Sequence, residues 1–73
     1  MKVIYDPETD TLDLIFRDEP IAESDEARDG VIIDYGKDGR LVSIEVLDAS
    51  ENVREPGIIT YEAKTTPTAP TSR

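Results

Sequence analysis

Apolar and polar residues alternate along most of the first 50 residues, in short runs separated by turn-forming sequences. Side chains of a β-strand point alternately to the two faces of a sheet, so a period of two predicts strands. We predict four strands on this basis, at residues 2–5, 11–16, 31–35 and 41–47. Such alternation is typical of an antiparallel sheet with one apolar face and one wet face.

Turn signals join these strands in pairs. Residues 6–10, Asp-Pro-Glu-Thr-Asp, separate the first two strands, and residues 36–40, Gly-Lys-Asp-Gly-Arg, separate the other two. Proline fixes φ at a turn, and an Asp-Gly pair between apolar runs favours a tight hairpin. The sequence therefore predicts two hairpins within a four-stranded antiparallel meander.

Residues 21–29 fit two interpretations. In the first, Ser24 caps a single helical turn that ends at Gly30. In the second, Ile21 to Ser24 form a short strand at the edge of the sheet. The residue pattern does not choose between them.

The chain changes character after the fourth strand. Asp48 and Glu51 are spaced as in a capping box, which predicts a helix of one or two turns ending near residues 55–57. We predict a β domain with this short helix at residues 1–53. Residues 54–64 are an extra strand or a linker, with a candidate fifth strand at 58–61. The Thr/Pro-rich residues 65–73 are predicted to be a disordered tail.

These elements predict a mainly β fold of the α+β type, with its core on one face of the sheet. The expected core residues are Val3, Tyr5, Leu12, Leu14, Phe16, Val31, Ile33, Val42, Ile44, Val46 and Val53. Asp34 and Glu45 are expected to be solvated on the opposite face. Ser43 lies on that face as well, so we expect Ser43→Ala to be nearly neutral.

Residue composition narrows the chemistry. The chain has no cysteine and no histidine, so it lacks the commonest general base and the usual zinc ligands. Asp6-x-Glu8-x-Asp10 begins like a calcium loop, but Thr11 stands where glycine is needed and Arg17 where a bidentate glutamate is needed. A polar turn is the better interpretation. We predict no catalytic residue, no cofactor, no metal site and no enzymatic activity.

The charge points toward basic protein partners. The net charge is −9, and the segment from Asp6 to Glu26 carries nine acidic residues against one base. Nucleic acid is not an expected ligand, because phosphate binding needs clustered Lys and Arg. The candidate partner-binding residues are Asp6, Glu8, Asp10, Asp13, Asp18, Glu19, Asp34 and Glu45.

No segment is apolar enough for a membrane span. The longest apolar runs, such as residues 31–33, are far shorter than the about 20 residues that a membrane helix needs. The N-terminus has no signal-peptide pattern. A cytoplasmic location is therefore expected.

Several short pieces together resemble a known family. They are Tyr5-Asp6, Asp10-x-Leu12-x-Leu14, Gly30-Val31-x-Ile33-Asp34, Asp38-Gly39-x-Leu41-Val42 and Ile44-Glu45-Val46-Leu47-Asp48-Ala49-Ser50. In this frame, residues 2 to 53 resemble the bacterial domain-of-unknown-function family 2283. Asp13 and Ser43 depart from it, where an aromatic residue and a glycine are common. The resemblance implies a compact β-meander with a short helix, without an established activity.

The functional expectation is a non-enzymatic protein-binding module. Members of the resembled family are sometimes encoded beside small toxin-like proteins, which implies an antitoxin-like partner of a small basic protein as one alternative. A small carboxylate-based metal-dependent factor is the other. We also expect a homodimer, because a single sheet with one short helix leaves part of its apolar face in water.

Overall fold

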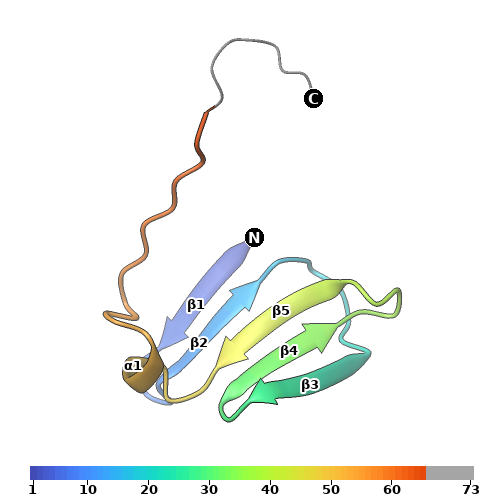
Figure 1. Cartoon of the computed structure of the whole chain (residues 1–73), viewed down its shortest axis with the longest axis horizontal. Coiled ribbons are helices and arrows are strands. Elements are labelled where there is room, and N and C mark those ends of the chain that lie inside the picture. The colour runs from blue at the N-terminus through green and yellow to red at the C-terminus, as the bar shows by residue number, and fades with distance from the viewer. Residues whose placement is uncertain (66–73) are drawn as a thin grey trace.

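The computed structural model describes residues 1–65 and consists of one antiparallel sheet with a short helix (Figure 1). The strands are β1 (Lys2–Asp6), β2 (Thr11–Ile15), β3 (Glu23–Arg28), β4 (Val31–Tyr35) and β5 (Leu41–Val46), and the helix is α1 (Ala49–Asn52). The predicted mainly β fold is confirmed. The predicted disordered tail falls almost wholly on residues 66–73, outside the described part of the chain.

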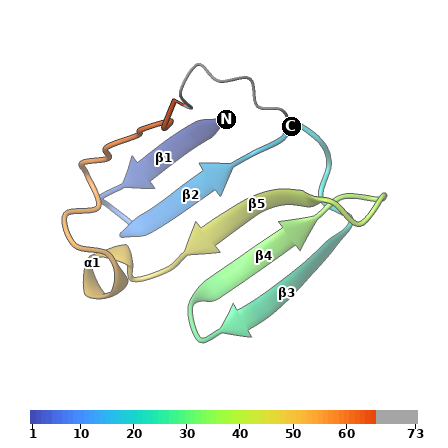
Figure 2. The ribbon, with the colours of Figure 1, turned by 45° about the horizontal axis from the view of Figure 1, so that its top comes forward.

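The sheet order is β1-β2-β5-β4-β3 (Figure 2). Both predicted hairpins are present, because β1 pairs with β2 and β4 pairs with β5. The hairpins are joined by β2 and β5, so the strand that comes last in the sequence lies at the centre. A simple meander order was therefore wrong: the link from β2 runs past the ends of β5 and β4 to reach the far edge (Figure 2).

The ambiguous segment at 21–29 is a strand. β3 begins at Glu23, two residues after the predicted start, and all six of its residues are exposed. Its backbone continues the ladder of β4, beginning with the Ala22 amide, which donates to the Tyr35 carbonyl at 2.8 Å. The helical-turn interpretation was wrong, because the outer edge of β4 offers this segment more backbone hydrogen bonds than one isolated turn would.

The region after β5 differs from its prediction. Asp48 has a left-handed φ of 51° and makes no side-chain capping bond, so the predicted capping box does not form. α1 has a single turn and lies beside the β1–β2 turn at one corner of the sheet (Figure 1). Residues 58–61 form no strand and are exposed, so the candidate fifth strand was placed wrongly. The fifth strand is β3.

The core residues predicted on the strands lie on one face of the sheet, as expected, but most of them are not buried. Cross-strand pairing places Ile33, Ile44 and Leu14 on one face, as expected. Of the residues predicted for the core, however, only Leu12 and Val42 are buried, and Ala49 of α1 joins them. Residues 1–65 form one sheet with a single helical turn at its corner, so most apolar side chains on this face stay partly exposed.

Candidate functional site

Apolar side chains form a continuous array on one side of the sheet. It consists of two cross-strand rows that run over β1, β2, β5 and β4. We call it the apolar face. The first row is Tyr5, Leu12, Val46 and Val31, and the second row is Val3, Leu14, Ile44 and Ile33.

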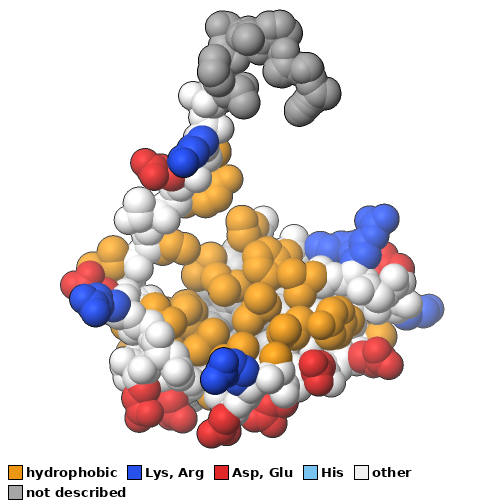
Figure 3. Space-filling view, viewed as in Figure 1, with side chains coloured by type: hydrophobic (Ala, Val, Ile, Leu, Met, Phe, Trp, Pro, Cys, Tyr) orange, Lys and Arg blue, Asp and Glu red, His pale blue; other side chains and the backbone are white. Residues whose placement is uncertain are grey.

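Charged side chains of these four strands are kept off the apolar face. Strand alternation places Lys2, Asp6, Asp13, Asp34 and Glu45 on the opposite side of the sheet, which we call the polar face. Figure 3 shows hydrophobic side chains gathered over the middle of the sheet, with acidic side chains along the lower rim. The two faces therefore differ sharply in their chemistry.

The polar face contains a buried carboxylate. Asp34 is only 1% exposed. Ser24 of β3 donates from Oγ to Asp34 Oδ1 at 2.6 Å, and Ser43 of β5 donates from Oγ to Oδ2 at 2.7 Å. The three residues form one cross-strand row. The expectation of a solvated Asp34 was wrong, because the neighbouring strands surround it and supply donors.

Asp34 is also coupled to Glu45 on the adjacent strand. Burial by itself would raise the pKa of Asp34, but hydrogen bonds from Ser24, Glu45 and Ser43 lower it below its usual value. The hydrogen bond to Asp34, together with burial and the charges of Asp34 and Asp13, raises the pKa of Glu45 to about 7. Near neutral pH, Glu45 therefore holds a proton part of the time and Asp34 remains ionised.

Asp10 links the first hairpin to the helix. Its carboxylate accepts hydrogen bonds from the Ser50 amide at 3.0 Å and from Ser50 Oγ at 2.7 Å. Tyr5 donates from its hydroxyl to Asp10 Oδ1 at 2.8 Å. These bonds, with those from Ser50 first, lower the pKa of Asp10. Asp10 thus supplies the cap that Asp48 does not.

The other candidate partner-binding residues are scattered. Asp6 accepts from the Glu8 amide within the β1–β2 turn. Glu19 pairs with Arg17 at 2.7 Å in the link that follows β2, where Asp18 also lies. Asp13 faces Glu45 across the β2–β5 pairing. The eight residues occupy the β1–β2 turn, the link after β2 and the polar face, so the structure does not gather them into one site.

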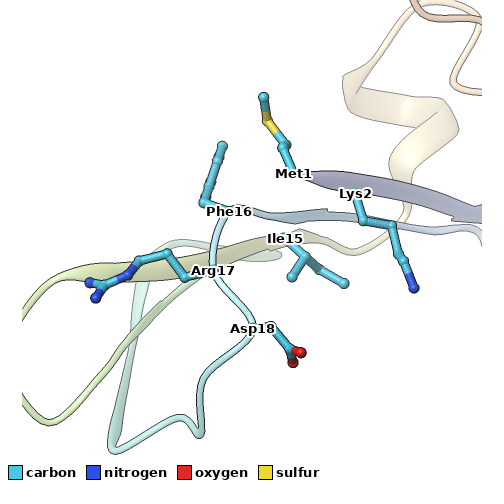
Figure 4. A pocket seen from close by; sticks show the side chains of 6 residues that line it. All are labelled: Met1, Lys2, Ile15, Phe16, Arg17 and Asp18. Atoms are coloured by element: carbon cyan, nitrogen blue, oxygen red, sulfur yellow. The ribbon is translucent and has the colours of Figure 1, made fainter.

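Two hollows lie near the N-terminal end of β1. The first, of about 360 Å³, adjoins the ends of β1 and β2 (Figure 4). Figure 4 shows Met1 and Phe16 pointing to one side of the sheet and Ile15 and Asp18 to the other, so this hollow follows the sheet end and is not a closed cavity.

The second hollow extends the apolar face. It measures about 460 Å³ and is lined by Met1, Val3, Leu14, Ile59 and Tyr61. Sequence reasoning missed this contribution of residues 59 and 61, because the segment contains no regular element that would direct it toward β1.

Two further observations concern residues 1–65 alone. No group of three or more acidic side chains there is arranged to hold a metal ion. No helix in this part of the chain is long and apolar enough to cross a membrane.

Comparison with known proteins gives one match. The family model described as "Protein of unknown function (DUF2283)" matches residues 2–50, from the start of β1 into α1. No curated protein and no solved structure matches the chain significantly. The match covers more than half of the chain and includes both rows of the apolar face.

Proposed function

The chain belongs to the DUF2283 family of proteins of unknown function, and we propose that it acts as a non-enzymatic protein-binding module through its apolar face. One observation carries the proposal: eight apolar side chains form two unbroken rows, and no second layer covers them within residues 1–65. Stable domains bury the apolar face of a sheet against another layer, and exposed apolar patches mark interaction surfaces.

The polar face supports a structural role for its carboxylates. Both oxygens of Asp34 already accept hydrogen bonds from serine hydroxyls of neighbouring strands. A carboxylate engaged in this way positions β3, β4 and β5 relative to one another. The shallow hollow on this face measures about 280 Å³ and is lined by Asp13, Ile15, Ile21, Ser43 and Glu45. Its one hydroxyl, that of Ser43, is already engaged as a donor to Asp34 at 2.7 Å.

The test compares three baits in extracts of cells that express the chain natively: the wild type, Ile33→Lys on the apolar face and Ile32→Lys on the polar face. The two residues are neighbours in β4, and both are partly exposed. We expect wild type and Ile32→Lys to retain the same bound proteins, and Ile33→Lys to lose them. Equal capture by all three baits contradicts the proposal.

An acidic contact with a basic partner is the antitoxin-like form of this proposal. Glu23 and Asp25 are exposed on β3, at the rim of the apolar face, and would meet basic side chains of a bound protein. Binding carried by these carboxylates weakens as salt rises, whereas apolar contacts persist. Repeating the capture at low and high salt separates the two contributions.

A further inference from the structure

We propose that the partner on the apolar face is a second copy of this chain, and that the two sheets pack face to face as a two-layer β-sandwich. The inference rests on the proposed function and names its partner. Sheets packed in this way lie about 10 Å apart, with their apolar side chains interdigitated.

Charge distribution favours a second copy. A two-fold interface brings the same patch of both subunits together, so an acidic patch would face an acidic patch, and a charged residue near the axis would meet its own copy. The two rows of the apolar face contain no charged side chain, and the acids of β2, β4 and β5 lie on the polar face. On this side of the sheet the acids lie only on the edge strand β3, with Asp25 opposite Ile33 and Glu23 opposite Tyr35. Two chains of net charge −9 can therefore join over the other four strands, with the carboxylates of β3 left at the rim.

The described chain does not supply its own second layer. After β5 it contains only the single turn of α1 and an exposed segment without strands. Residues 66–73 contain Ala69 as their only apolar side chain apart from two prolines, too little to cover two rows of four. A copy of the same sheet matches the missing layer in length, width and polarity.

Side chains beside β1 enlarge the contact surface. Met1, Ile59 and Tyr61 are 76%, 63% and 75% exposed, and they line the apolar hollow with Val3 and Leu14. This hollow continues the second row beyond the edge of β1. Side chains of a second copy would fill it and bury these three residues.

The size of the patch sets the expected affinity. Four strands about 4.8 Å apart and about five residues long span roughly 20 Å by 17 Å. Even with the side chains of the hollow added, this is at the small end of interfaces, which typically bury about 800 Å² per partner. We therefore expect a dimer with a dissociation constant in the micromolar range. Added salt should tighten it, since it screens the repulsion between acidic rims.

Sedimentation equilibrium over a series from low to high micromolar protein tests the proposal. The wild type should shift from 8.1 kDa toward twice that mass. Ile33→Lys should raise the dissociation constant at least about 100-fold, because it buries two like charges in each dimer. The matched variant Ile32→Lys should dimerise as the wild type does. A monomer of the wild type at every concentration, in both low and high salt, overturns the inference.

A second measurement uses the unaltered chain, in case Ile33→Lys does not fold. Isotope-filtered NOE spectra of mixed labelled and unlabelled protein should show contacts between copies at Ile33 and Ile44. Contacts at Ile32 instead would place the dimer on the polar face and refute the arrangement. A monomeric chain that still captures another protein through Ile33 would refute only the dimer. If the wild type neither dimerises nor captures another protein through Ile33, the proposed function is refuted as well.

Discussion

Asp34 shows how one side chain can organise three strands. It is buried on the polar face, with one oxygen bonded to β3 and the other to β5. A buried carboxylate without donors would strongly destabilise the fold. Ser24 and Ser43 avoid this cost by donating hydrogen bonds to Asp34. The burial of Ser43 changes the expectation for its replacement.

We predict that Ser43→Ala destabilises the protein by about 1–3 kcal/mol, because it leaves one oxygen of a buried carboxylate without a donor. The sequence alone suggested a nearly neutral change, and burial contradicts that expectation. Ser24→Ala should cost less, since Ser24 lies on the exposed edge strand, where water can replace it. Urea denaturation of both variants measures the difference; equal costs would contradict this account.

Glu45 makes stability depend on pH. Its pKa in the folded protein is about 7, above the ordinary value of 4.5. The folded state therefore binds more protons than the unfolded state between these values, and the stability from Glu45 is lost as pH rises through this window. Because Glu45 is partly exposed, we expect the free energy of unfolding to fall by only on the order of 1 kcal/mol between pH 5 and 8. This corresponds to a decrease of about 4–8 °C in melting temperature.

Glu45→Gln removes the titrating group and keeps a donor for Asp34. Its melting temperature should vary less than that of the wild type across this pH range, and it should exceed the wild type at pH 8. Glu8→Gln, in the exposed β1–β2 turn, is the control and should retain the wild-type dependence. A Glu45→Gln profile parallel to that of the wild type would refute the assignment.

At the scale of elements, α1 depends on a residue far away in the sequence. A single helical turn is not stable alone, and here Asp10 caps it from the first hairpin turn. Asp10 has a φ of 55°, which glycine and asparagine tolerate. Substitutions at this position can therefore remove the carboxylate without adding backbone strain.

We expect Asp10→Gly to release α1 and lower the melting temperature, with Asp10→Asn intermediate because it keeps one acceptor oxygen. Because the pKa of Asp10 is lowered in the folded state, its contribution is present above its ordinary pKa and lost as pH falls through the lowered value. Hydrogen exchange at the Ser50 amide reports the release directly. Glu8→Gly in the same turn should leave that amide protected.

Most strands could be predicted from the alternation of apolar and polar residues along the chain. The features that could not be predicted depend on contacts between residues far apart in the sequence. β1, β2, β4 and β5 lie within a residue of their predicted bounds, because each alternates apolar and polar side chains. β3 has no such alternation: the outer edge of β4 organises it through backbone bonds. The cap from Asp10 and the burial of Asp34 depend on contacts between strands, which the pattern within one strand does not encode.

For the whole molecule, stability should depend on protein concentration. If the second copy supplies the missing layer, association stabilises the folded state by mass action. The melting temperature of the wild type should therefore rise with each tenfold increase in concentration, and that of Ile33→Lys should stay constant. Differential scanning calorimetry measures both. A wild-type melting temperature independent of concentration up to high micromolar protein would contradict the expectation.

The strand order also has a consequence for biosynthesis. A ribosome releases the chain from its N-terminus, so the hairpin of β1 and β2 emerges first, followed by β3 and β4. Two-stranded hairpins are marginal in water, and these two share no pairing with each other. Only β5 contacts both β2 and β4. The nascent chain must therefore stay unassembled until Val46 has left the exit tunnel, and the sheet then forms in one late step.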